Sequence, residues 1–443
     1  MMHAIYAILK TTLKCAWSTR ATIWLLVSST LPALFAPFLL QADGTTEGAR
    51  TMILTYTPVL IFGILLTGTI WLSAYALAAE RIQPSFAMLR TKPVSGATIW
   101  IAKWLAVLTI LVTALMIAGI TFILSLEARF RGESMANSPV WTAFRPDESH
   151  IILQAQQHLD RLREETPPDE AHHLPSLQQI ANRLRQQNYR VAPGTGTSWH
   201  VPIAADTDHH PMDMLFSWRL DPMRRAPVSG VWTLTFPGKT EPLAIQNVAG
   251  LLDGNHTTSW SRLEIPPEAT YLEVRFTASA DNEPMIFFDV KNPITLRQFA
   301  GTLRTNLIRT AGIMIILCAA ATALTLAMSA FLSFPVTVFA SHGIMAALLI
   351  ATVAGHDSII SQHTHGHAHC NTESWLAHQT GHFLDIVYRA SHTLRAAMPF
   401  RRLAEDIRVT FPENTWTLIA LSILLPALCA ALAHYKIMRD EVV

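Results

Sequence analysis

The chain alternates between long apolar stretches that carry no charge and segments in which charged side chains are frequent. A helix needs about 20 mainly apolar residues to cross the hydrocarbon core of a bilayer. Stretches of this kind without Asp, Glu, Lys or Arg occupy residues 21–42, 51–79, 104–126, 310–356 and 414–435. Four of them fit one crossing each. The longest fits two crossings with a break near Pro335, because proline lacks the N–H group that a helix interior needs. The pattern predicts six transmembrane helices, at 21–41, 53–79, 104–126, 310–332, 336–355 and 415–435.

The segment between the third and fourth predicted helices, residues 127–309, has a different pattern. Across 145–190, apolar residues recur at helical spacing between strongly charged positions, which predicts a hairpin of two water-exposed helices. From 197 to 296 the period changes to two, and short runs separated by Pro, Gly and Asn predict a β-sandwich. The predicted fold is a mainly α membrane protein. It has six transmembrane helices and an inserted extracytoplasmic α+β domain, a helical hairpin plus a β-sandwich, between helices 3 and 4.

Basic residues predict the orientation, because cytoplasmic loops carry an excess of Lys and Arg. Lys10, Lys14 and Arg20 precede the first predicted span with no acidic residue among them, and Lys436 and Arg439 follow the last one. Both termini and the loop at 80–103 are therefore expected in the cytoplasm. Residues 127–309 and 356–413 are expected on the other side.

These predictions divide the chain into successive parts. They are an amphipathic cytoplasmic helix at 1–20, transmembrane helices 1–3 at 21–126 with a cytoplasmic loop at 80–103, the extracytoplasmic domain at 127–309, transmembrane helices 4 and 5 at 310–355, an extracytoplasmic His-rich loop with an amphipathic or re-entrant segment at 356–413, and transmembrane helix 6 with a cytoplasmic tail at 414–443.

Composition narrows the function classes. Only 15% of the residues are charged and 50% are hydrophobic, whereas soluble globular proteins carry about 25% charged residues. The net charge of +1 gives no reason to expect a nucleic-acid partner. The sequence has no phosphate-binding loop of the G-x-x-x-x-G-K-[ST] type and no HExxH or GxSxG motif, so we expect no enzyme activity from this chain alone.

A histidine tract in the second extracytoplasmic segment is the candidate metal site. His363, His365, His367 and His369 alternate and Cys370 follows them. Imidazole and thiolate groups are good ligands for zinc and copper. The alternative, which we favour, is a polar loop with incidental metal affinity.

The loop after the second predicted span carries a further pattern. An acidic residue is followed by a hydrophobic stretch, a Leu-x-x-x-Pro-Val-Ser turn and a lysine at the start of the third helix. The residues at these positions are Glu80, Leu89, Pro93, Val94, Ser95 and Lys103. Together with the amphipathic N-terminal segment, this pattern resembles the type-2 family of ATP-binding-cassette (ABC-2) transporter permeases.

The resemblance implies a permease subunit of an ATP-driven exporter in the bacterial inner (cytoplasmic) membrane. A separate ATPase subunit would bind ATP and Mg²⁺, and this chain would hold no cofactor. Two permease chains would line the pathway, as a homodimer or a heterodimer with a similar chain. The surface that contacts the ATPase would comprise Glu80, Arg81, Leu89, Arg90, Pro93, Val94, Ser95 and Lys103.

Two other interpretations stay open. One is a membrane-anchored binding or sensor protein whose extracytoplasmic domain captures a ligand. The other is a metal-handling membrane protein, similar to the permeases of copper-site maturation systems, that would use the histidine tract.

Overall fold

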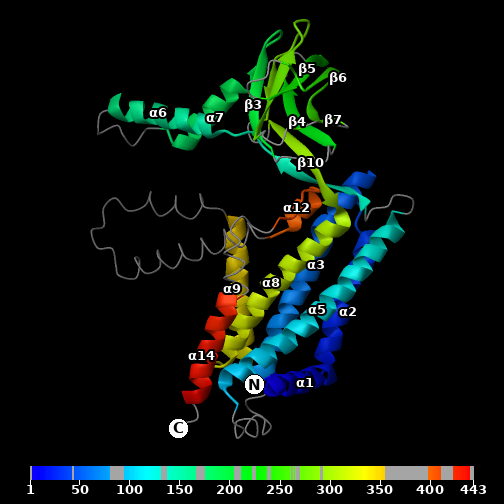
Figure 1. Cartoon of the computed structure of the whole chain (residues 1–443), viewed down its shortest axis with the longest axis vertical. Coiled ribbons are helices and arrows are strands. Elements are labelled where there is room, and N and C mark those ends of the chain that lie inside the picture. Colours follow the sequence, from blue (N-terminus) through cyan, green and yellow to red (C-terminus); the bar gives the residue numbers. More distant parts are fainter. Residues whose placement is uncertain are drawn as a thin grey trace. The chain divides into compact units, whose positions relative to one another are not determined.

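The computed structural model divides the chain into two compact units, which are shown in Figure 1. A helical unit comprises Met1–Ser138 and Thr302–Val443, and a β-rich unit comprises Pro139–Gly301. The β-rich unit is shorter than the predicted interval of 127–309 because the flanking helices extend into it from both sides. The structure describes residues 2–41, 44–79, 94–130, 137–165, 175–203, 211–221, 226–236, 241–260, 263, 265, 270–289, 293–354, 398–410 and 423–439.

The helical unit is built mainly from long apolar helices. They are α1 (Met2–Ser18), α2 (Arg20–Leu39), α3 (Thr46–Ala74) with the π-helical turn η1 (Tyr75–Ala79), α5 (Gly96–Arg129), α8 (Leu303–Ser329), α9 (Phe334–Ala354), the short α12 (Phe400–Ala404) and α14 (Leu425–Arg439). Within the described residues, four of them are long and apolar enough to cross a membrane: α2, α3 with most of η1, α5 and α8. The chain is therefore a membrane protein with a β domain.

Four of the six predicted spans are present as helices of sufficient length and apolarity to cross a membrane. Shorter apolar helices, Phe334–Leu348 and Leu425–Tyr435, lie where the fifth and sixth spans were predicted, and those two spans stay a prediction. The predicted break near Pro335 is confirmed, since α8 ends at Ser329 and α9 begins at Phe334. Pro335 stands in the first turn of α9, where its missing N–H has no intrahelical partner to lose.

Several hydroxyl groups inside these helices donate to a carbonyl of their own helix. Ser73 Oγ donates to the Thr69 carbonyl at 2.6 Å, and Thr322 Oγ1 donates to the Cys318 carbonyl at 2.7 Å. Both side chains are fully buried. Such small residues let helix backbones approach closely, and in these two the hydroxyl group is satisfied by the local backbone.

A polar cluster fixes the segment that follows α12 to the other helices of this unit. Arg50 of α3 forms an ion pair with Asp406 at 2.6 Å. The buried Asn306 of α8 donates to the Ile407 carbonyl at 3.0 Å and accepts from the Val409 N–H at 2.6 Å. This segment belongs to the amphipathic or re-entrant segment predicted within 356–413, of which residues 398–410 are described.

The β-rich unit contains two antiparallel sheets, as the sandwich prediction requires. One sheet has the order β1-β10-β4-β9-β2 with β7 also paired to β4, and the other has the order β3-β8-β5-β6. The strands are β1 (Pro139–Phe144), β2 (Arg190–Val191), β3 (Gly196–Pro202), β4 (Met212–Leu220), β5 (Val228–Thr235), β6 (Ala244–Leu251), β7 (Gly254–Trp260), β8 (Tyr271–Ala278), β9 (Ile286–Phe288) and β10 (Ile294–Thr302).

Alternation along the strands places an aromatic core inside this unit. In β8, Leu272, Val274 and Phe276 are fully buried, whereas Tyr271 and Arg275 are exposed. Trp232 of β5 lies 4.8 Å from Phe276, measured between ring centroids, and is also fully buried. Aromatic pairs at this distance add to the stabilisation that comes from burial alone.

The predicted helical hairpin is also present in this unit. It consists of α6 (Ser149–Glu165) and α7 (Leu177–Asn188). The two helices pack through the buried residues Ala155, Leu159, Ile180 and Ala181. Ser176 caps α7 in a capping box with Gln179, which satisfies two N–H groups that a helix start leaves free.

A partly buried polar triad joins the two helices to the sheet. Glu148, just before α6, accepts from Tyr189 Oη at 2.6 Å and from Arg185 Nε at 2.9 Å. Tyr189 is 4% exposed and directly precedes β2. Burial, and then the hydrogen bond to the Glu148 carboxylate, raise the pKa of the Tyr189 phenol well above its usual value.

The raised pKa of Tyr189 predicts a loss of stability in alkaline solution. The folded chain keeps the phenol protonated at pH values where the unfolded chain, with a tyrosine pKa of about 10, releases the proton. The stabilisation is therefore complete below pH about 10 and is lost as the pH rises through the folded pKa. Above pH about 10, we expect the denaturant midpoint of the β-rich unit to fall less steeply with pH in Tyr189→Phe than in the wild type. Equal slopes for the variant and the wild type would contradict this prediction.

Gly230 of β5 gives a second prediction. A Cβ at this position would lie 2.5 Å from the Phe276 ring and 2.8 Å from the Thr277 carbonyl oxygen. Because Phe276 is fully buried, it has no free space to move into. We expect Gly230→Ala to lower the free energy of unfolding by about 1–3 kcal/mol, the usual cost of overpacking. Thermal unfolding of the purified chain measures this loss of stability. Ser229→Ala, at the neighbouring position, is the control. A variant as stable as the control would show that the core is loosely packed here.

Candidate functional site

The best-defined candidate site is the place where α1, η1 and the first turns of α5 meet, at one end of the helical unit (Figure 1). Ile8 of α1 forms a buried cluster with Ile99 and Ala102 of α5, and Ile5 and Val94 pack against it. The predicted amphipathic helix at 1–20 is thus present as α1. It uses Ile5 and Ile8 to dock on α5. We call this region the α1–α5 junction.

Ser95 starts α5 at this junction. Its Oγ accepts from the Thr98 N–H at 3.3 Å and lies 2.8 Å from Thr98 Oγ1. A serine at this position satisfies one of the N–H groups that the first turn of a helix leaves free. The helix therefore begins at Gly96, eight residues before the predicted span at 104–126.

Lys103 has a different position from the one we expected. The prediction placed it on the surface that contacts an ATPase, but its side chain is only 1% exposed. Its ammonium donates a hydrogen bond to the Ala76 carbonyl in η1. The carbonyls at the end of a helix have no intrahelical partner, and a positive charge near them is favourable. Lys103 therefore joins α5 to η1 inside the protein and is not available as a contact residue, which corrects the prediction for this position.

The same end of α5 is also attached to α8 and α14. Trp100 and Leu77 are buried among small residues of those helices, including Ala323 and Ala433. Trp104 donates from Nε1 to the Ala319 carbonyl at 3.1 Å. A displacement of the start of α5 would therefore disturb contacts with α3, α8 and α14 together.

The other predicted site residues fall largely outside the described residues. This applies to five of the predicted ATPase-contact residues and to the whole candidate metal set: Glu80, Arg81, Leu89, Arg90, Pro93, His363, His365, His367, His369 and Cys370. Val94 and Ser95 are described, and both lie at the junction. Within the described part of the chain, no three His, Cys, Asp or Glu side chains come together as a metal site.

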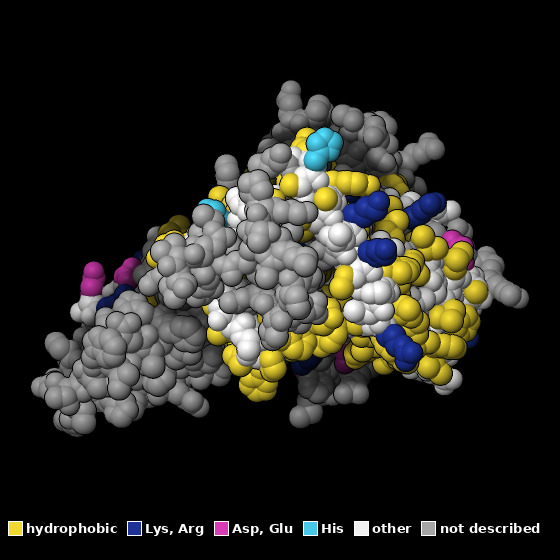
Figure 2. Space-filling model, turned by 90° about the horizontal axis from the view of Figure 1, so that it is seen from below, with side chains coloured by type: hydrophobic (Ala, Val, Ile, Leu, Met, Phe, Trp, Pro, Cys, Tyr) yellow, Lys and Arg dark blue, Asp and Glu magenta, His cyan; other side chains and the backbone are white. Residues whose placement is uncertain are grey.

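Positive charge is concentrated on the surface of this junction. Lys10, Lys14 and Arg20 are exposed, and residues 2–41 contain no acidic side chain. Viewed from this end of the unit, Figure 2 shows basic side chains among exposed hydrophobic ones. Trp17 and Tyr6 of α1 are 58% and 65% exposed. This combination is typical of a helix that lies at a membrane surface.

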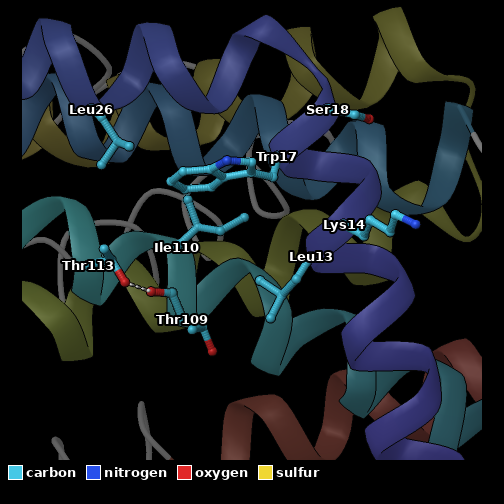
Figure 3. A pocket seen from close by; sticks show the side chains of 8 residues that line it. All are labelled: Leu13, Lys14, Trp17, Ser18, Leu26, Thr109, Ile110 and Thr113. Carbon is cyan, nitrogen blue, oxygen red and sulfur yellow. Dashed lines mark hydrogen bonds between the residues drawn. The ribbon is translucent and has the colours of Figure 1, made fainter.

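A pocket that the sequence did not predict lies beside the junction. It has a volume of about 520 Å³ and lies between α1, α2 and α5 (Figure 3). Its lining residues are Leu13, Lys14, Trp17, Ser18, Leu26, Thr109, Ile110 and Thr113. Leu13 and Trp17 are four residues apart and so lie on one apolar face of α1, but which helices that face meets depends on the packing.

No protein-family model and no curated protein matches this chain. The functional interpretation therefore depends on the geometry of the junction and on the residue pattern described above.

The buried position of Lys103 predicts a structural effect of its replacement. In Lys103→Met the Ala76 carbonyl loses the hydrogen bond from the ammonium group, and removing one partner of a buried hydrogen bond costs about 1–3 kcal/mol. We expect a lower unfolding temperature for the detergent-solubilised chain. Lys10→Met, which changes an exposed lysine of α1, should leave that temperature unchanged. Equal unfolding temperatures for the two variants would show that the Lys103 contact does not stabilise the fold.

Proposed function

We propose that this chain is the permease subunit of an ATP-driven transporter and that it works with a separate ATPase subunit. It would lie in the inner (cytoplasmic) membrane of a bacterium with both termini in the cytoplasm, and export is the direction that the family resemblance implies. The observation that carries the proposal is the α1–α5 junction. It pairs an amphipathic basic helix with the start of a long apolar helix.

The position of the junction in the chain supports a role in coupling. The loop at 80–93 is bounded by η1, which ends at Ala79, and by Val94 and Ser95 at the start of α5. The Lys103 contact joins α5 to η1 close to these two boundaries. A soluble protein that pushes on the loop would therefore act on α3 and α5 together, and on α1 through Ile8.

The other helices of the unit support the same role. The start of α5 contacts α8 and α14 through Trp100 and Trp104. Tightly packed helices move as units because a packed interior does not deform continuously. ATP binding to the partner would thus shift the equilibrium between two arrangements of these helices. A second permease chain, identical or similar, would complete the pathway.

ATP hydrolysis by the co-purified complex tests this proposal. The full chain is expressed with an ATPase subunit that co-purifies with it, and vanadate-sensitive hydrolysis is measured in nanodiscs. We expect Ile8→Ser to reduce the rate about tenfold, because it undocks α1, and coupling free energies of about 1–3 kcal/mol are typical. Tyr6→Ser is the matched control, since Ile8 is 6% exposed and Tyr6 is 65% exposed on the same helix.

Two outcomes would count against the proposal. One is a chain that binds no ATPase although it is folded. The other is an equal effect of Ile8→Ser and Tyr6→Ser, which would mean that the docking of α1 does not transmit the signal. Tight binding of a ligand by the chain alone would favour the interpretation as a binding or sensor protein, and stoichiometric bound metal would favour the metal-handling one.

A further inference from the structure

The pocket beside the junction has the size and the lining of a ligand site. Its volume of about 520 Å³ lies within the range of about 300–1,000 Å³ that small-molecule pockets usually have. Three helices form its walls. Figure 3 shows Leu13 and Trp17 from α1, Leu26 from α2, and Ile110 from α5 around it.

The pocket offers an apolar lining although half of its residues are polar. Thr109 Oγ1 donates to the Leu105 carbonyl at 2.8 Å, and Thr113 Oγ1 donates to the Thr109 carbonyl at 2.9 Å. Ser18 Oγ likewise donates to the Cys15 carbonyl at 2.7 Å. Because these hydroxyl protons are already used within their own helices, the three side chains offer no free hydroxyl donor to an occupant. A hydrocarbon chain fits such a lining better than a polar ligand does.

Charge marks one side of the pocket. Lys14 is the one charged residue among the eight that line it. Its ammonium points away from the Trp17 and Ile110 side chains in Figure 3, so the apolar part of the lysine lines the pocket while its charge reaches outward. A molecule with an apolar chain and an anionic end matches this arrangement.

We propose that the pocket binds one acyl chain of an anionic phospholipid, with the headgroup phosphate beside the Lys14 ammonium. Trp17, which is 58% exposed, covers the chain near the headgroup, where tryptophan is favoured in membrane proteins. This lipid site is additional to the transport function proposed above and does not depend on an ATPase partner.

Quenching of Trp17 fluorescence by brominated lipids tests the site. The full chain is reconstituted in phosphatidylcholine nanodiscs that contain either phosphatidylglycerol or phosphatidylcholine with brominated acyl chains, at equal mole fraction. The Trp17 signal is the difference between the wild type and Trp17→Phe. We expect brominated phosphatidylglycerol to quench Trp17 more strongly than brominated phosphatidylcholine does.

Two pairs of variants separate the pocket from general surface charge. Lys14→Gln should lower the preference for phosphatidylglycerol about fivefold, the effect expected of one lysine near an anionic surface. Lys10→Gln changes another exposed lysine of α1 that does not line the pocket, and it should have a much smaller effect. Thr113→Phe should fill the pocket and reduce quenching by both lipids. Its control is Thr121→Phe, a threonine of α5 away from the pocket with the same kind of backbone hydrogen bond.

Three results would overturn the proposal. They are equal quenching by the two brominated lipids, equal effects of Lys14→Gln and Lys10→Gln, and unchanged quenching in a folded Thr113→Phe chain. Lys14 is exposed, so Lys14→Gln is expected to fold and keeps the test decisive if Thr113→Phe does not fold. Loss of ATPase coupling with intact lipid binding, or the reverse, would distinguish failure of the transport proposal from failure of this one.

Discussion

A backbone N–H or C=O group that is buried away from water needs a hydrogen-bond partner from the protein itself. Among the described residues of the helical unit, two buried side chains, Lys103 and Asn306, supply such partners. Lys103 supplies the partner for the Ala76 carbonyl in the π-turn. Asn306 satisfies both the Ile407 carbonyl and the Val409 N–H where the chain leaves α12. These buried polar groups are therefore requirements of the fold, and each one also connects helices that are distant in the sequence.

The interiors of the two units are packed in different ways. The difference follows from the surroundings of each unit, which are water for the β-rich unit and lipid for the helical unit. The β-rich unit has an aromatic core, with Trp199, Trp232 and Phe276 all buried, because removal of large apolar side chains from water is its main source of stability. In the helical unit, small residues such as Ala323, Ala327 and Ala433 fill the contacts. Between helices in lipid the hydrophobic effect is weak, and close approach of small residues takes its place.

These physical differences also explain how much of the structure the sequence predicts. The absence of charge identifies the four helices that are long and apolar enough to cross a membrane, and the period of two in Leu272, Val274 and Phe276 identifies a strand with one buried face. The start of α5 is less predictable, because a serine cap extends the helix beyond the uncharged run.

The site was harder to predict than the spans. Lys103 and Ala76 meet only because a π-turn ends α3 and α5 packs beside it, which no residue spacing encodes. The pocket likewise needs three helices in their final packing.

The contacts along α5 link the junction to the pocket. Lys103, which bonds to η1, and Ile110, which lines the pocket, are about two helical turns apart and so lie on the same face of α5. Between them, Val107 lines a smaller gap together with Thr12 of α1 and Ala76 of η1. α1 therefore cannot move away from α5 without a change in the pocket, the gap and the surroundings of Lys103. If a motor protein moves α1 and a lipid fills the pocket beside it, both act on one helix pair, and each would alter the free energy of the other's binding.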